Sequence, residues 1–111
     1  MSPTRFKLVF FVPPAALSAC KSAIFAAGAG SFPGKGGYTE CAFTSKGIGQ
    51  FRPGDGANPH IGTKGELEEV EEVRVESICL DRDVAVKAVD ALKKAHPYEE
   101  PAYEVYKMED L

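Results

Sequence analysis

Residues 96–101 bring together an imidazole, a phenol, two carboxylates and two prolines. An imidazole near carboxylates can be held in one tautomer and tuned near neutral pH, as metal binding or acid–base catalysis requires. Pro97 cannot continue a helix, and the second proline restricts the residue before it, so these groups lie on a stiff connector. In the alternative interpretation, which the pattern favours, His96 caps the last carbonyls of a helix and Glu99 and Glu100 are solvated.

The second histidine, His60, lies in a loop rich in glycine and proline, where a histidine has no packing role. If this loop folds over a subunit boundary, His60 could meet Glu99 or Glu100 of a neighbouring chain. Zinc or copper would need three or four ligands, for example His60, His96, Cys41 and a carboxylate. No pair of these residues has the close spacing of a metal motif, so a divalent metal held by His60 and His96 is only one candidate cofactor.

Arg52 is a further candidate, because it follows an aromatic residue and directly precedes a rigid turn at Pro53. A guanidinium there could hold a carboxylate or a phosphate through two hydrogen bonds. The pattern slightly favours the alternative, in which Arg52 pairs with an acidic strand that contains Glu68, Glu69, Glu71 and Glu72. The eleven glycines all lie within residues 28–65, but none leads from a strand into a helix as in a phosphate-binding loop.

The three cysteines are too few and too widely spaced for a disulfide framework, which indicates a reducing compartment. Cys20 and Cys79 occupy positions typical of small hydrophobic residues, and Cys41 alternates with Phe43 in the same way. No serine, histidine and aspartate occur in the context of a catalytic triad. We therefore assign no catalytic residue.

Length and composition favour one globular domain over residues 1–111, with 44% hydrophobic residues and enough chain to bury a core. The net charge of -3 and the scattered basic residues argue against nucleic acid or an anionic membrane as partner. The apolar stretch at residues 8–16 is broken by two prolines and is shorter than the roughly 20 residues of a membrane span. It also lacks a secretory cleavage pattern, so we expect a soluble cytoplasmic protein.

Periodicity predicts the elements of the first half of the chain. Residues 6–12 form a short apolar run typical of a buried strand. A double proline then opens a helix that ends at Gly28, with an apolar stripe of Leu17, Cys20, Ile24 and Ala27. Residues 38–45 and 48–52 are extended and joined at Lys46-Gly47, with a bulge expected at Gly49.

The second half contains a long strand, a helix and a last strand. Residues 67–80 alternate, with an inner face of Val73, Val75 and Cys79, as in a half-exposed antiparallel ladder. Asp81 or Asp83 caps a helix whose buried stripe is Ala85, Ala88, Val89, Leu92 and Ala95. Residues 102–108 form the last strand. This order predicts an α+β, ferredoxin-like split βαβ fold, an antiparallel sheet with two helices on one face.

The uncovered face of this sheet receives Val9 and Phe11 from the first strand, while Phe6, Leu8 and Phe10 point to the other side. Such a face is too apolar to leave in water, so we expect self-association.

Four motifs in order resemble the accessory domain of the NIF-three-like (Ngg-interacting factor three) family. They are Lys7-Leu8-Val9-Phe10-Phe11-Val12-Pro13, Ala27-Gly28-Ala29-Gly30, Gly49-Gln50-Phe51-Arg52-Pro53 and His96-Pro97-Tyr98-Glu99-Glu100-Pro101-Ala102-Tyr103. The resemblance implies a stand-alone form of this module, with a fold similar to the PII and CutA proteins, which are typically trimeric. In long members the two-metal site lies in a flanking domain. This chain has only two histidines, so the resemblance implies no catalytic activity.

Our leading hypothesis is a regulatory homo-oligomer, a trimer rather than a dimer, that binds a small ligand or a protein partner at clefts between subunits. The candidate ligand-binding residues are Arg52, His60, His96, Tyr98, Glu99 and Glu100. The competing hypothesis is a metal-assisted hydrolase that uses His60, His96 and nearby carboxylates. A third is an interaction module that serves a separate chain resembling the family's metal domain.

Overall fold

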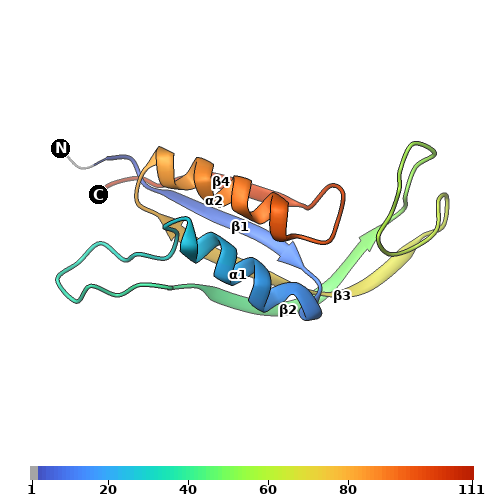
Figure 1. Ribbon diagram of the computed structural model, residues 1–111, viewed down its shortest axis with the longest axis horizontal. Helices are drawn as coiled ribbons and strands as arrows, with labels where there is room; N and C mark the ends of the chain where they lie inside the picture. The colour runs from blue at the N-terminus through green and yellow to red at the C-terminus, as the bar shows by residue number, and fades with distance from the viewer. Residues whose placement is uncertain (1–2) are drawn as a thin grey trace.

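The computed structural model describes residues 3–111 and contains one four-stranded antiparallel sheet with two helices on one face (Figure 1). The elements are β1 (Phe6–Val12), the 3-10 turn η1 (Pro14–Ala16), α1 (Leu17–Ala26), β2 (Phe43–Phe51), β3 (Glu68–Cys79), α2 (Arg82–Ala95) and β4 (Tyr103–Lys107). The strand order is β2-β3-β1-β4, and every neighbouring pair is antiparallel. The α+β, ferredoxin-like fold expected from the sequence is confirmed.

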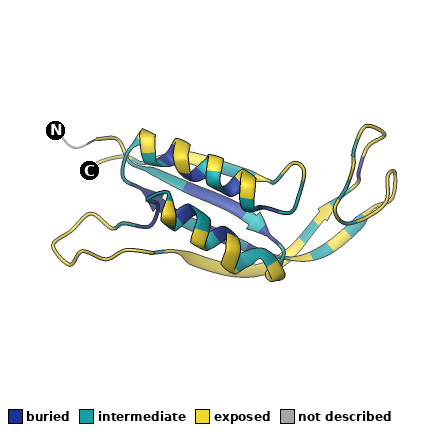
Figure 2. Cartoon of the chain, in the orientation of Figure 1, coloured by how far each residue is buried: buried dark blue, intermediate teal, exposed yellow. Residues whose placement is uncertain are grey.

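The hydrophobic core lies between the helices and the two central strands, β1 and β3 (Figure 2). Phe10 of β1 lies opposite Val75 of β3, and both are fully buried. The alternation along β1 and β3 sends every second side chain into this layer, and the helices cover it with Cys20, Ile24, Ala85, Ala88 and Leu92. The apolar stripes predicted for both helices therefore supply the buried residues.

Local sequence signals fix the ends of the helices. Asp81 is the N-cap of α2, since its Oδ1 accepts a hydrogen bond from the backbone N–H of Val84 at 2.8 Å. His96 ends α2 in extended backbone, as expected for a residue before proline. Gly28, two residues after α1, has a φ of 108°, which favours glycine. Of the two aspartates considered as caps, Asp81 is therefore the correct one.

The prediction of two short strands joined at Lys46-Gly47 is wrong. Residues 43–51 form one strand whose register against β3 runs unbroken from Phe43 opposite Glu76 to Phe51 opposite Glu68, so no bulge occurs at Gly49. β3 is 12 residues long and offers a continuous partner along its edge, which keeps the glycine-containing segment extended. Residues 38–42, also expected to be extended, lie in the loop before β2.

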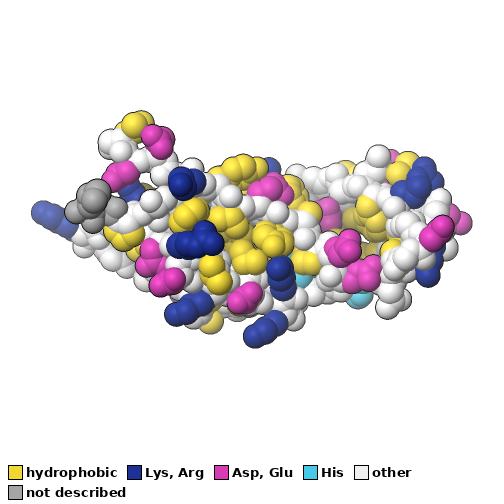
Figure 3. Space-filling view, turned by 90° about the horizontal axis from the view of Figure 1, so that it is seen from above, with side chains coloured by type: hydrophobic (Ala, Val, Ile, Leu, Met, Phe, Trp, Pro, Cys, Tyr) yellow, Lys and Arg dark blue, Asp and Glu magenta, His cyan; other side chains and the backbone are white. Residues whose placement is uncertain are grey.

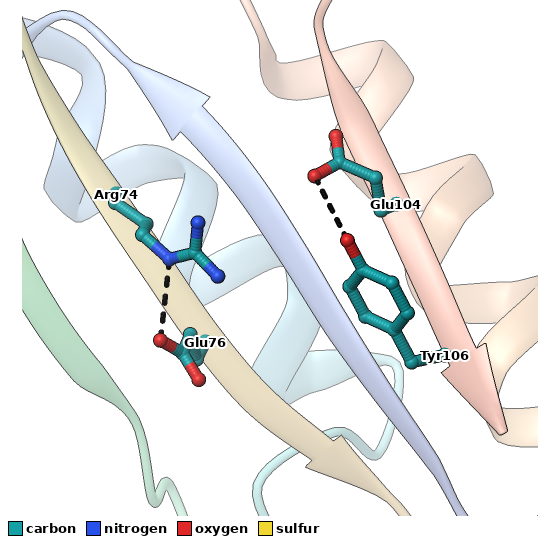
Figure 4. Close-up of polar contacts among 4 residues, drawn as sticks. All are labelled: Arg74, Glu76, Glu104 and Tyr106. Atoms are coloured by element: carbon teal, nitrogen blue, oxygen red, sulfur yellow. Dashed lines mark hydrogen bonds and ion pairs between the residues drawn. The ribbon is translucent and has the colours of Figure 1, made fainter. Parts of the chain in front are cut away.

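The sheet face opposite the helices is more polar than the sequence suggested. Val9 lies between Glu76 and Glu104 in the register and is only 1% exposed in the single chain. Figure 4 shows two polar contacts on this face, with the helices behind the strands. Arg74 forms an ion pair with Glu76 at 3.2 Å, and the Tyr106 hydroxyl donates to Glu104 at 3.4 Å.

Apolar area nevertheless remains on this open face. The Arg74 guanidinium carbon lies 5.6 Å from the centroid of the half-buried Phe11 ring, so a charge covers part of it. Phe43 and Tyr106 stay 67% and 51% exposed. The open face is therefore a mixture of ion pairs and exposed rings.

The chain is elongated, with extents of 49 × 24 × 22 Å. The outer halves of β2 and β3, with the loop that joins them, project beyond the helices as a hairpin arm, defined here as residues 47–72 (Figure 1). The link between α2 and β4, residues 96–102, turns at the same end of the molecule and is called the connector. Within residues 3–111 no helix has both the length and the apolar content needed to cross a membrane.

Candidate functional site

A cavity of about 320 Å³ lies between the hairpin arm and the connector. Its lining includes five of the six candidate residues, brought together from positions almost fifty residues apart: Arg52, His60, Tyr98, Glu99 and Glu100. One chain supplies all of them, so no subunit boundary is needed to bring His60 near the glutamates. Figure 3 shows histidine and acidic side chains together at this end of the molecule.

The sixth candidate, His96, is only 6% exposed and is not part of the cavity lining, but it contacts the lining residue Tyr98. Its Nε2 lies 2.7 Å from the carbonyl oxygen of Phe11, and its Nδ1 accepts the backbone N–H of Tyr98 at 3.1 Å. These partners assign the proton to Nε2, because a carbonyl can only accept and an N–H can only donate. Burial lowers the pKa of His96, so the neutral ring is favoured.

Tyr98 is the central side chain of the site. Its hydroxyl donates to Oε2 of Glu72 at 3.0 Å. Burial, followed by this hydrogen bond and the charge of Glu72, raises the pKa of Tyr98 well above its usual value of 10. The Tyr98 ring centroid lies 4.8 Å from that of His96, 6.3 Å from that of His60 and 6.4 Å from that of Phe51. Tyr98 is therefore a neutral hydrogen-bond donor surrounded by rings.

Two hydrogen bonds to backbone carbonyls order the loop of the hairpin arm at the cavity. Arg52 donates from Nη1 to the carbonyl oxygen of Gly65 at 2.8 Å, and Gly65 donates to the carbonyl oxygen of Pro53 at 2.7 Å. In the part of the chain that the structure describes, Arg52 forms no ion pair with a glutamate, so the pairing favoured from the sequence is wrong. Arg52 instead stabilises the loop and presents its charge at the cavity.

A second contact joins the arm directly to the connector. The backbone N–H of Asn58 donates to Oε1 of Glu99 at 2.8 Å. Glu100 also lines the cavity and is exposed. The acidic residues of the connector are therefore not merely solvated, since one of them holds the loop in place.

The geometry gives little support to a metal centre built from both histidines. Both nitrogens of His96 are engaged, so a metal would have to displace the Phe11 or the Tyr98 contact. Cys41 is absent from the cavity lining, and its carbonyl accepts a hydrogen bond from Ser77 at 2.7 Å. Across residues 3–111 there is no group of three His, Cys, Asp or Glu side chains arranged to hold a metal ion.

The buried cysteines are unsuited to nucleophilic chemistry. Burial raises the pKa of the Cys20 thiol. Burial and the nearby charge of Asp81 raise the pKa of Cys79 to about 11. Since the thiolate is the nucleophile, both are inert core residues.

A second hollow of about 300 Å³ adjoins the cavity on the open face of the sheet. Glu72 lines both hollows, and Gly47, Gly49, Phe11 and Arg74 line the second.

Glu72 is the site residue that the sequence analysis missed, because it was considered only as one of four possible partners of Arg52 on the acidic strand. A Cβ at Gly49 would collide with the Glu72 carboxylate, so glycine allows this side chain to lie across β2. Glycine inside a strand often marks a close approach of this kind. Gly49 was therefore the local signal for the close approach of Glu72, but it was interpreted as the site of a bulge.

Comparison with known proteins places the whole chain within larger relatives. No protein-family model matches it. A protein of Halalkalibacterium halodurans named "GTP cyclohydrolase 1 type 2 homolog" is 46% identical over 101 residues, which are 91% of this chain and 26% of that protein. The chain thus spans about a quarter of the length of the curated relatives that it matches.

Solved structures show the same relation. A Bacillus cereus protein related to NIF3 superimposes with a TM-score of 0.81 and 37% identity, over 99% of this chain and 27% of that one. CutA from Archaeoglobus fulgidus has a TM-score of 0.67 at 12% identity, covering 96% of this chain and 85% of its own. GlnK from B. subtilis has a TM-score of 0.61 at 16% identity, covering 95% and 85%. CutA and GlnK therefore share the fold of this chain.

Proposed function

Because this chain is homologous to the PII/CutA-like module of NIF3-related proteins, we propose that it is a single-domain regulatory module that binds a small ligand or a partner in the cavity between the hairpin arm and the connector. The relatives are about four times longer, so their name describes a whole protein of which this chain aligns with about a quarter.

The observation that carries this proposal is the fixed arrangement of the cavity lining. His96 holds the Tyr98 backbone, Glu72 holds the Tyr98 hydroxyl, and Glu99 holds Asn58. Polar groups that are already ordered lose less conformational entropy when a ligand arrives. A concave surface with apolar walls and a few fixed polar groups is typical of small-molecule sites.

We also propose that the module forms a homo-oligomer, with a trimer favoured by its resemblance to PII and CutA proteins. The exposed rings of Phe43 and Tyr106 on the open face support this, because another copy would remove them from water. The strands at both edges of the sheet, β2 and β4, also have unpaired sides that a second chain could meet. A cytoplasmic location remains part of this proposal.

A metal-assisted hydrolase is the weaker candidate, since no observation favours it. Its histidine pair is divided: His60 is exposed at the cavity, whereas His96 is buried with both nitrogens engaged. The phenol of Tyr98 is held protonated, which suits a binding group better than a base.

A thermal-shift screen over small amines, carboxylates, phosphates, nucleotides and divalent metals tests the binding proposal. A ligand that binds only the folded chain raises the melting temperature, with about 2.7 kcal/mol of stabilisation at 100 times its Kd. The shift should change in Arg52→Ala and Glu100→Ala, which remove opposite charges from the cavity lining, but should stay the same in Lys87→Ala, an exposed change on α2. Equal shifts in all three variants would place binding elsewhere and contradict the proposal.

Light scattering tests the assembly separately. A mass of three chains is expected, and Phe43→Asp should reduce it if the open face is the interface. A single-chain mass would contradict self-association without affecting the cavity, which one chain lines completely.

A further inference from the structure

The charges around the cavity are unbalanced toward the negative. Three carboxylates, Glu72, Glu99 and Glu100, line it with a single guanidinium, that of Arg52. Arg52 is exposed and already directs one nitrogen at the Gly65 carbonyl. The local potential therefore favours a cation over an anion.

Two of these carboxylates are held in place with acceptor capacity left over. Glu72 uses Oε2 for the Tyr98 hydroxyl, and Glu99 uses Oε1 for the Asn58 N–H. An ionised carboxylate offers two oxygens with about four acceptor sites, so each can still accept a hydrogen bond from a ligand. Their existing bonds orient them before any ligand binds.

Three rings accompany the carboxylates. Phe51 and His60 are tilted by 51° and 45° relative to Tyr98, with centroids 6.4 and 6.3 Å away. Ring faces attract cations, and the attraction grows where water is displaced. Pro53, Pro59 and Ile61 add apolar wall. Aromatic faces, apolar wall and fixed carboxylates together suit a cation that has a hydrocarbon body.

On the basis of the proposed ligand-binding function, we propose that the cavity selects an organic cation, an alkylammonium or alkylguanidinium group. Its charged end lies against Glu99 and Glu100, and its hydrocarbon body lies against the Tyr98 and Phe51 rings. A volume of about 320 Å³ is enough for one such group. The cation is either a free amine or a lysine or arginine side chain of a partner.

The test is an NMR titration of the isotopically labelled full chain. Butylammonium and butylguanidinium are the cationic probes; butyrate, inorganic phosphate and magnesium chloride are the matched controls. We expect saturable shifts at the amides of Tyr98 and Asn58 with the two organic cations alone. Added salt should weaken the binding, because exposed charges are screened beyond about 8 Å at 0.15 M.

Charge-neutral variants locate the site. Glu99→Gln keeps an acceptor for Asn58 and removes only the charge. Glu100→Gln removes the charge of the neighbouring carboxylate, and both positions are exposed. Each should weaken the affinity for the organic cation about two- to fivefold, as expected for exposed ion pairs. Glu71→Gln, an exposed change outside the cavity lining, should leave the affinity unchanged. Equal weakening by Glu71→Gln would overturn the proposed site.

The remaining outcomes separate this inference from the proposed function. Tighter binding of a blocked lysine peptide than of butylammonium identifies a partner side chain, and the reverse order identifies a free amine; both support the inference. Saturable shifts with butyrate or phosphate that vanish in Arg52→Gln overturn it but leave a ligand-binding cavity. Magnesium shifts equal to those of the amines also overturn it. If no probe of any charge binds, the proposed function fails as well.

Discussion

The helix-covered body and the hairpin arm are ordered by different forces. In the body, β1, β3 and the helices bury a continuous apolar layer that includes Phe10, Ile24 and Leu92. In the arm, β2 has no fully buried residue, and single polar contacts such as Tyr98 to Glu72 hold the surrounding loops. Burial therefore determines the stability of the body, whereas point contacts determine the shape of the site.

The largest expected effect on stability comes from truncating a phenylalanine in each of these two regions. Phe10→Ala should lower the free energy of unfolding by about 3–5 kcal/mol, because it leaves a cavity in the fully buried core. Phe51→Ala should lower it by much less, since Phe51 is half-buried at the end of β2. Urea denaturation of the two variants gives both values. Equal losses would mean that the arm is part of the core and would remove the distinction.

The second prediction concerns His96, which joins the body to the connector. His96→Ala removes the contacts to the Phe11 carbonyl and the Tyr98 N–H, so we expect a loss of about 1–3 kcal/mol, typical of buried polar groups left without partners. His60→Ala is the matched control, because His60 is exposed, and it should change stability by less than about 0.5 kcal/mol. A similar loss in both variants would show that His96 is no special support.

The body was predictable because its signals are periodic and local. The run at residues 6–12 matches β1 residue for residue, and the predicted stripe of α2 contains the buried Ala85, Ala88 and Leu92. Proline, glycine and aspartate each act on the backbone within a few residues. Such effects can be interpreted from the sequence without knowledge of the fold.

The site was predictable only in part, because it depends on contacts between distant segments. The residue types of the connector and Arg52 were conspicuous, and they do line one cavity. Nothing local, however, indicates that Glu72 meets Tyr98, 26 residues later, or that Gly65 would take the place of a glutamate as the partner of Arg52. The length of the arm also depends on the continuous pairing of β2 with β3. The glycines of β2 made this segment look interrupted in the sequence.

Two glycines on β2 allow a sharper test of how the arm is shaped. Gly49→Ala places a methyl group against the Glu72 carboxylate, whereas Gly47→Ala meets nothing within 4 Å. Gly47→Ala should be neutral or stabilise the chain by up to about 1 kcal/mol, because the unfolded chain loses freedom. In Gly49→Ala the same gain should be outweighed, with a net loss of about 1 kcal/mol, because the flexible carboxylate must leave Tyr98. Urea denaturation measures both.

A double-mutant cycle identifies the partner. In a Glu72→Ala background the penalty of Gly49→Ala should disappear, since the obstructing side chain is gone. A penalty that persists would place the strain in the backbone of β2 and not in the Glu72 contact.

The smallest effect is the pH dependence of stability, and it tests whether His96 belongs to the body. Burial lowers its pKa below the ordinary 6.5; the proximity of His60 acts in the same direction, and the Phe11 carbonyl and Glu72 oppose it. The unfolded chain therefore binds this proton more readily. The stabilisation is complete above about pH 6.5 and is lost as the pH falls toward the folded-state pKa.

Unfolding free energies at about pH 7.5 and about pH 5.5 should reveal this slope in the wild-type chain. His96→Gln, whose side chain does not titrate, should start lower at the higher pH and lose less between the two values. His60→Gln should reduce the slope only slightly, because His60 is the smallest of the four influences on the pKa of His96. The acidic residues are common to all three proteins, so differences in slope report the histidines alone. If His60→Gln flattens the slope and His96→Gln does not, the group responsible for the pH dependence lies in the exposed arm. The assignment of this pH dependence to His96 would then be wrong.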